Sequence, residues 1–338
     1  MQDVARLAGV SVKTVSNVVN DYKHVSAPMR RRVQDAIDKL GYEVNVSARN
    51  LRTGRTGLIT LALPELRLPY FAELAGSVIA EAEKAGLRVL VEQTNGSRDR
   101  ELELLQGGLN RMVDGVIFSP LALGPDDLAA FSVRFPLVLL GERVFGSPND
   151  HVTMSNVAAA QAATKHLIDA GCRRIAMIGS HREEVVGSAV LRERGYRAAL
   201  AEAGLPVDEE LIIETRPWQR TTGARLTDQL LRDGLEIDGI FAANDSLALG
   251  VLHSLNVHRV AVPDAVAVIG FDDVEDASFA HPTLSTVCPG REQISREAVR
   301  LLRVRIAESA ATPPVDRSPA QTIYADFRIM QRESSDRR

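Results

Sequence analysis

Residues 58–93, LITLALPELRLPYFAELAGSVIAEAEKAGLRVLVEQ, determine the fold class of most of this chain. The apolar run at 58–63 has the length of a buried strand, the stretch at 71–85 has helical spacing, and a second apolar run follows at 88–93. A strand, a helix and another strand in this order form a unit in which the two strands are parallel and the crossover is right-handed. The stretch therefore predicts an α/β fold built on a parallel sheet.

The same alternation continues as far as residue 271. Further apolar runs that predict strands lie at 115–118, 137–140, 174–179, 211–214, 239–243 and 266–271. Amphipathic stretches that predict helices lie at 99–112, 189–203, 223–233 and 246–255. The second half echoes the first, because 81–91 and 200–213 each end a helix at Ala-Gly and run on towards a strand. We therefore expect two similar Rossmann-like lobes rather than one long sheet.

The segment before this alternation predicts short helices. DVARLAGVSVKTVSNVVN, at 3–20, predicts a helix, a tight turn at Gly9 and a second helix capped by Ser11. A third helix is expected after Ser26 and ends at Gly41. The spacing assigns an inner face to Val4, Leu7, Ala8, Val15, Val18, Met29, Val33, Ala36, Ile37 and Leu40. A helix, a short turn and a helix form the helix-turn-helix arrangement of DNA-binding proteins.

Charge is distributed unevenly along the chain. The formal net charge of all 338 residues is −4, but residues 1–57 carry ten Lys and Arg against five acids, a net of +5. The remaining residues carry a net of −9. A basic head on an acidic body indicates that the head meets a polyanion such as DNA.

Several classes of protein are disfavoured by the sequence. The apolar content of 45% is too high for a disordered chain, and no apolar run approaches the roughly 20 residues of a membrane span. Cys172 and Cys288 lie in no CxxC pair, so we expect two reduced thiols and no metal site in a cytoplasmic protein. Nucleophile-elbow, phosphate-loop, HExxH and dinucleotide-binding motifs are missing, so we expect neither an enzyme nor a cofactor.

Several motifs in order resemble one known family along nearly the whole chain. DVARLAGVSVKTVSNVVN and the segment from His24 to Ile59 closely resemble the head of the LacI/GalR family of bacterial transcriptional regulators. The stretches FAANDSLALGVL and VAVIGFDDVEDASFAHPTLSTV resemble the body of that family, which has the fold of type I periplasmic binding proteins. The resemblance implies a helix-turn-helix domain at 1–44, a hinge helix and linker at 45–57, an effector-binding and dimerisation domain at 58–330, and a charged tail at 331–338. It divides the body into a first lobe at 58–156 and 286–317 and a second lobe at 157–285 and 318–330.

The resemblance also assigns DNA-binding residues. It places Val12, Lys13 and Asn17 on the second helix as readers of base edges, and it implies that Ser11, Thr14 and Ser16 bind phosphates. Asn17 stands where many relatives have arginine, and asparagine favours adenine where arginine favours guanine. Thr14 and Ser16 also suit simple packing or capping of the helix.

The family's hinge helix corresponds to residues 45–51. In that interpretation two hinges of a dimer meet in the minor groove, Ala48 permits their close approach, and Leu51 inserts between base pairs and kinks the DNA. The alternative is that 43–56 is only a flexible linker.

Candidate effector-binding residues follow the strands, because ligands of open α/β sheets lie beyond the carboxyl ends of strands. The resemblance implies contacts from Arg192, Trp218, Asn244 and Asp272, and the turn after 58–63 adds Tyr70 and Phe71. Asp245 suits either a helix cap or a ligand contact, and Asp273 suits a role in holding its loop. Some sugar-responsive relatives have aspartate at the position of Gly141, next to Glu142, so the contact there is open.

We therefore expect a homodimeric transcriptional regulator, a repressor, that binds a near-palindromic operator in double-stranded DNA. We expect its affinity for DNA to be set by a small effector, a sugar, because Trp218 can stack on a sugar ring and Asp272 can bind hydroxyls. The alternatives are a purine or another metabolite as effector, a sugar-binding protein without regulatory DNA binding, and a sugar-processing enzyme. The C-terminal FRIMQRESSDRR is too short and too charged for a tetramerising heptad repeat.

Overall fold

The computed structural model describes residues 1–19, 22, 24–42, 55–107, 112–181, 183–311 and 316–337. Its contacts divide the chain into two units, Met1–Thr56 and Gly57–Arg338. The expected hinge residues Ala48 and Leu51 lie outside the described residues.

The first unit contains a helix-turn-helix. Its described helices are α1 (Gln2–Ala8), α2 (Val12–Val19) and α3 (Ala27–Leu40). Gly9 ends α1 in the left-handed conformation, with φ of 63°, which glycine adopts without steric cost. The Arg32 guanidinium donates a hydrogen bond of 2.6 Å to the Ala8 carbonyl and thereby ties α3 to this turn. The buried core of the unit consists of Val4, Ala5, Ala8, Val15, Val18, Val33 and Ala36.

Two expected core residues of the head lie outside this core. Leu7 is 52% exposed and Leu40 is 46% exposed. The inner face of α1 passes through Val4, Ala5 and Ala8, so Leu7 projects from the side of the helix. The expectation that these two leucines are buried was wrong. The helices of the head pack instead through the smaller side chains of valine and alanine.

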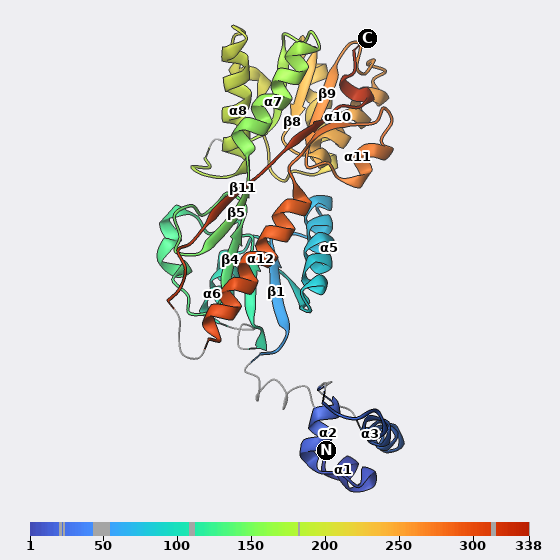
Figure 1. Ribbon diagram of the computed structural model, residues 1–338. Coiled ribbons are helices and arrows are strands. Elements are labelled where there is room, and N and C mark those ends of the chain that lie inside the picture. The colour runs from blue at the N-terminus through green and yellow to red at the C-terminus, as the bar shows by residue number, and fades with distance from the viewer. Residues whose placement is uncertain are drawn as a thin grey trace. The chain divides into compact units, whose positions relative to one another are not determined.

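The first lobe of the second unit contains, among the described residues, a six-stranded sheet in the order β11-β5-β4-β3-β1-β2, and its paired neighbours are parallel. The strands are β1 (Leu58–Leu63), β2 (Arg88–Gln93), β3 (Gly115–Phe118), β4 (Leu137–Leu140), β5 (Asp150–Met154) and β11 (Thr322–Ala325). The helices of this lobe are α5 (Pro69–Lys84), α6 (Arg98–Gln106), α12 (Arg291–Ser309) and the 3-10 helix η2 (Pro125–Phe131). Helices α5 and α12 pack side by side (Figure 1).

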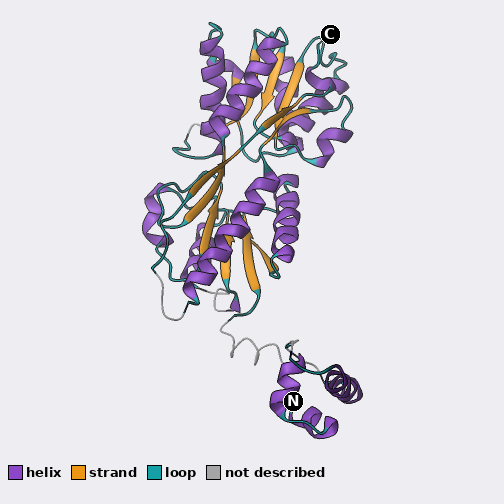
Figure 2. Cartoon of the chain, viewed as in Figure 1, coloured by secondary structure: helices purple, strands orange, loops and turns teal. Residues whose placement is uncertain are grey.

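The second lobe contains, in the described part of the chain, a six-stranded sheet in the order β12-β10-β9-β8-β6-β7. Its strands are β6 (Ile175–Ser180), β7 (Ile212–Glu214), β8 (Gly239–Ala242), β9 (Ala267–Phe271), β10 (Ser285–Cys288) and β12 (Arg328–Met330). Its helices are α7 (Asn156–Asp169), α8 (Ser188–Glu202), α9 (Arg220–Arg232), α10 (Asp245–Val257), α11 (Glu275–Phe279), η3 (Glu209–Leu211) and η4 (Glu333–Ser335). Both sheets lie among helices (Figure 2), which confirms the expected α/β lobes.

Four features of the second unit differ from expectation. Strand β11 pairs with β5 of the first lobe, although 318–330 was assigned to the second lobe, and β10 extends the second lobe to Cys288. Strand β12 pairs antiparallel with β10 in an otherwise parallel sheet. Helix α6 ends at Gln106, earlier than the expected 99–112, because Gly107 adopts the left-handed conformation there.

The C-terminal residues are part of the second lobe rather than a loose charged tail. The Ser334 and Ser335 side chains are buried, and the Ser334 hydroxyl donates to the Val268 carbonyl at 2.7 Å. The Arg337 guanidinium donates through Nε to the Pro263 carbonyl at 2.9 Å. The many charges at 331–337 suggested an exposed tail, but Ser334 and Ser335 are buried. Their hydroxyl groups form hydrogen bonds with Ser285 of β10.

Candidate functional site

The exposed side of α2 presents the residues that the sequence assigns to DNA. Val12 is 43% exposed and Lys13 is exposed, whereas Val15 and Val18 face the core. The Ser11 hydroxyl accepts the Thr14 N–H at 3.1 Å, which confirms that Ser11 caps the helix. Ser16 and Asn17 follow on the same helix and are half-buried. The structure thus places Ser11, Val12, Lys13, Thr14, Ser16 and Asn17 on or next to one short helix that follows the turn.

A cleft between the two lobes contains a cavity of about 570 Å³. Residues at the carboxyl ends of strands from both sheets line it, as expected for α/β lobes that face each other. The structure brings all the predicted effector-binding residues to this cavity: Tyr70, Phe71, Arg192, Trp218, Asn244 and Asp272. Their contact with an effector stays a prediction.

Arg192 forms one wall of the cleft and is only 3% exposed. Its Nε donates to Asn156 Oδ1 at 2.8 Å, and its Nη1 donates to the Ala243 carbonyl. The same Nη1 lies 3.8 Å from Asp272 Oδ1. Burial lowers the pKa of Arg192 and raises the pKa of Asp272, while the attraction between the two charges opposes both shifts. The pair is thus part of the buried wall of the cleft.

Asp245 has neither of the two roles, helix cap or ligand contact, that the sequence left open for it. Asn244 Oδ1 accepts the Leu247 N–H at 2.9 Å and caps α10, so Asn244 rather than Asp245 is the cap. Asp245 is fully buried and accepts the Thr286 hydroxyl at 2.6 Å and the Val274 N–H at 3.0 Å. Burial raises the pKa of Asp245 to about 7. Asp245 therefore braces the sheet behind the cleft and does not line it.

The cavity is also lined by polar residues that the sequence analysis did not name: Arg143, Thr153 and His181. Among the described side chains, these three and Glu142 and Trp218 each have one buried atom without a hydrogen-bond partner. Together with the charged side chains of the cleft, these residues make the surroundings of the cavity polar. His181 directly follows β6, so the rule of strand ends could have found it.

The position flagged as doubtful, Gly141, has φ of 83°. This left-handed conformation favours glycine and strains an aspartate placed there. The neighbouring Glu142 carries the carboxylate instead: its Oε2 accepts the Ser188 hydroxyl at 2.6 Å, and its Oε1 is the unpaired oxygen.

Glu184 links the lobes at the rim of the cleft. Its Oε1 lies 2.9 Å from Arg143 Nη1 and 3.2 Å from Arg216 Nη2, and its Oε2 lies 3.5 Å from His181 Nδ1. Burial opposes ionisation of Glu184, but His181 and the two arginines outweigh it and lower the pKa of this carboxyl. Arg143 belongs to the first lobe and Glu184 to the second, so the pair joins the two sides of the rim.

The described residues contain no cluster of His, Cys, Asp or Glu placed to hold a metal ion. In the same residues, no helix is both long and apolar enough to cross a membrane. Cys172 and Cys288 are free buried thiols, and burial raises the pKa of Cys172 to about 11.

Comparison with known proteins identifies both units. Residues 1–45 match the model for bacterial regulatory proteins of the lacI family, and residues 164–335 match the model for a periplasmic binding protein-like domain. The ribose operon repressor of Escherichia coli (strain K12) is 31% identical over 310 residues, which cover 91% of this chain and 93% of the repressor. A solved structure from Sanguibacter keddieii, described as a LacI-family transcriptional regulator, is 45% identical with a TM-score of 0.76, covering 84% of this chain and 100% of that chain.

The Lac repressor dimer bound to operator and the anti-inducer ONPF is 25% identical, with a TM-score of 0.82 and 98% of each chain covered. The matches to the ribose operon repressor and to the Lac repressor cover both the head and the body of this chain. The chain belongs to the lacI family of bacterial regulatory proteins, which are DNA-binding transcriptional regulators and not enzymes.

Proposed function

We propose that this regulator is a homodimeric repressor whose affinity for a near-palindromic operator is set by a sugar bound in the cleft between its lobes. The observation that carries the proposal is the cavity of about 570 Å³ between the lobes, which is lined by the charged residues Glu142, Arg143 and Asp272 and by the aromatic residue Trp218. Ligand pockets in proteins commonly have volumes of about 300–1,000 Å³, so this cavity is large enough for a small effector.

The chemistry of the lining residues favours a ligand with several hydroxyl groups. Arg143 offers donors, Glu142 offers acceptors, and the Thr153 hydroxyl can act as either. A sugar hydroxyl donates and accepts at once and can therefore satisfy a mixed set of this kind. The Trp218 ring offers an apolar face on which a sugar ring can stack, and Asp272 offers a carboxylate to adjacent hydroxyls.

For DNA, we propose that Lys13, Asn17 and Val12 read base edges in the major groove, while Ser11, Thr14 and Ser16 bind phosphates. The Ser11 and Thr14 hydroxyls lie 2.9 Å apart at the start of α2, where a helix N-terminus favours a phosphate. We further propose that residues 45–51 order as a hinge helix on DNA, with Ala48 at the close approach and Leu51 inserted into the minor groove.

Relatives support repression and dimerisation. The ribose operon repressor is named for its role, and the Lac repressor was solved as a dimer on operator. In this chain, edge strand β2 leaves Leu90 42% exposed and Val91 39% exposed. Apolar side chains on a free sheet edge are typical of an interface, so we place part of the dimer contact there. Such a protein would act on DNA in the cytoplasm.

A thermal-shift screen tests the effector. The full chain is incubated with neutral mono- and disaccharides, with sugar acids, and with adenine, guanine and hypoxanthine. Saturation at a hundred times Kd adds about 2.7 kcal/mol, which corresponds to a rise of several degrees in melting temperature. A bound sugar should then change operator affinity in a gel shift.

The variant Glu142→Gln should weaken the sugar response, while Glu214→Gln, an exposed change in the same unit, should not. A response to nucleobases alone would replace the sugar by a purine effector. A sugar that binds without changing operator affinity would contradict the proposed regulation.

A further inference from the structure

The turn that carries Asp272 has an unusual backbone. Asp272 and Asp273 follow β9 with φ of 123° and 52°, both in the region that favours glycine. Non-glycine residues keep such conformations only where the surrounding structure holds them, and they cluster at ligand sites and switches. The turn sends the Asp272 carboxylate into the cleft and the Asp273 carboxylate to Arg332, at 2.7 Å.

The second lobe supplies part of the grip on this turn. The Asp272 N–H donates to the Val287 carbonyl at 2.9 Å, and the Asp273 N–H donates to the Thr286 hydroxyl at 3.3 Å. These contacts anchor the two N–H groups to β10. The two carbonyl groups of the turn point elsewhere.

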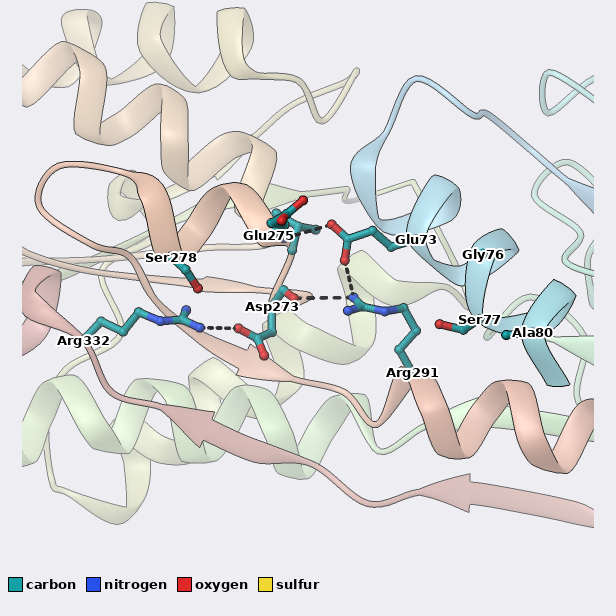
Figure 3. Close-up of a pocket in the computed structure, with 10 residues that line it drawn as sticks. Glu73, Gly76, Ser77, Ala80, Asp273, Glu275, Ser278, Arg291 and Arg332 are labelled. Atoms are coloured by element: carbon teal, nitrogen blue, oxygen red, sulfur yellow. Dashed lines mark hydrogen bonds and ion pairs between the residues drawn. The ribbon is translucent and has the colours of Figure 1, made fainter.

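Both carbonyls meet a side chain of the first lobe. Arg291, at the start of α12, places Nη1 at 3.4 Å from the Asp272 oxygen and 3.4 Å from the Asp273 oxygen. Glu73 of α5 holds this guanidinium, with Oε2 at 2.9 Å from Nη1. Its other oxygen, Oε1, accepts the Glu275 N–H at 2.9 Å, so Glu73 itself also contacts the second lobe (Figure 3).

We propose that Glu73 and Arg291 are a positioning pair for effector binding, which holds the Asp272–Asp273 turn in its ligand-binding shape and ties that shape to the angle between the lobes. This inference rests on the proposed function, because it gives Asp272 the role of ligand contact. Movement of the first lobe away from the second would remove Arg291 from the two carbonyls and leave the strained turn held from one side only. Ligand contact at Asp272 and lobe closure would then favour each other.

The hollow beside this pair has the features of a contact between the two lobes rather than of a second ligand site. It measures about 600 Å³ and is lined from both lobes, by α5 on one side and by the turn and α11 on the other. The charged side chains at its centre already have partners: Arg291 has Glu73, and Arg332 has Asp273 (Figure 3). Arg291 and Glu73 are 16% and 27% exposed, so the pair is partly shielded from water.

The test compares Glu73→Gln and Arg291→Gln with a matched control, Glu81→Gln. Glu81 is also on α5, is 25% exposed and pairs with Lys84 at 2.6 Å, but it makes no contact across the lobes among its described interactions. Amide hydrogen exchange is followed in peptides that cover 272–279. Loss of a partly exposed ion pair should speed exchange there by roughly two- to fivefold, while Glu81→Gln should leave it unchanged.

Acrylamide quenching of Trp218, the sole tryptophan, gives a second readout. Both pair variants should raise the quenching constant, because a looser joint opens the cleft. Exchange and quenching equal to those of Glu81→Gln would overturn the proposal. A rise in exchange across the whole body, with a lower melting temperature, would overturn it in favour of a general structural role.

Neither readout requires an effector, so the test gives a result even if no sugar binds. Cellobiose and D-ribose are then used as probes in the same quenching assay. If either protects Trp218 in the wild type, the pair variants should bind it several-fold more weakly, while Glu81→Gln should bind it normally. Equal binding by all variants would show that the joint does not position Asp272, without affecting the proposed function.

Discussion

The guanidinium carbon of Arg192 lies 3.6 Å from the centre of the Phe271 ring. This contact packs the guanidinium against the aromatic ring of Phe271, which is fully buried. Phe271 ends β9 and Asp272 follows it, so a single strand end supplies both the stacking surface and the carboxylate of Arg192. The wall therefore depends on Arg192, because no shorter cation could reach the ring, Asn156 and the Ala243 carbonyl together.

Arg192→Ala should destabilise the chain strongly. Removing one partner of a buried pair costs roughly 3–5 kcal/mol, since Asp272 would stay buried without its counter-charge. Urea unfolding followed by circular dichroism measures the loss. The control is Arg194→Ala, an exposed position on the same helix, which should change stability by less than about 0.5 kcal/mol. Similar small losses in both variants would contradict the role of Arg192 in the wall.

Stability should depend on pH through Asp245. Burial raises its pKa in the folded chain to about 7, above the ordinary 3.8, so the stabilisation from this group is complete below about pH 3.8. It is lost as the pH rises through 7, because the folded state must then hold a buried charge. Asp245→Asn cannot ionise, so its stability relative to wild type should rise between about pH 4 and pH 7, by up to about 1.4 kcal/mol per unit, and level off above pH 7.

The comparison uses denaturant unfolding at each pH, with the exposed Asp264→Asn as the control for general charge effects. The control should run parallel to wild type. A constant difference between Asp245→Asn and wild type would mean that Asp245 is ionised throughout this range, stabilised by Thr286, the Val274 N–H and the nearby Arg332.

The sequence predicted the strands that it shows as apolar runs, including the edge strands β2 and β7, and it missed four described strands, β5, β10, β11 and β12. Central strands such as 115–118 and 239–242 are buried on both faces and read as apolar runs. Strand β5, DHVTM, is buried too, but Asp150 is satisfied there by an ion pair of 2.6 Å with Arg305, which no local pattern reveals. Strand β11, TIYA, is an exposed edge and lacks an apolar run.

The sequence predicted those residues of the site that are polar and directly follow a predicted strand. Polar residues directly after strands, such as Asn244 and Asp272, could be placed in the cleft from order alone. Thr153 could not, because its strand was not found, and the partnership of Glu184 with Arg143 depends on how the lobes meet. Contacts between distant segments are set by tertiary packing, which leaves no periodicity in the sequence.

DNA recognition should depend on two residues of α2. Lys13→Ala and Asn17→Ala should each weaken operator binding by about 1–3 kcal/mol, as expected for the loss of a base contact. Binding to a scrambled duplex should change much less, most clearly for Asn17, which is uncharged. Gel shifts on both duplexes at one salt concentration measure this. The exposed Lys39→Ala on α3 serves as the control. Equal losses on operator and scrambled DNA would assign these residues to the backbone instead.

Dimerisation should depend on the free edge of the first sheet. Val91→Glu places a charge on β2 where we expect the partner, so the mass by light scattering should fall from about 74 kDa, twice the 36.8 kDa of one chain, towards that of one chain. Val304→Glu is a matched control, because Val304 is 40% exposed on α12 and Val91 is 39% exposed. A wild type near four chains in mass, or a dimer unaffected by Val91→Glu, would exclude this edge as the main contact.

The hinge makes the last prediction, and it concerns residues outside the described ranges. If Leu51 inserts into the minor groove, Leu51→Ala should leave the unfolding of the body and effector affinity nearly unchanged, since the residue belongs to neither lobe. Operator affinity and DNA bending should fall together, because unstacking a base step costs a few kcal/mol that the inserted side chain must offset.

A flexible linker would tolerate the smaller side chain, so it predicts wild-type affinity and bend. Measuring both quantities on one operator separates these two cases. Loss of affinity with an unchanged bend would indicate a simple contact without insertion. Only a joint loss supports a switch in which the effector, by changing the lobes, decides whether the two hinges can order on DNA.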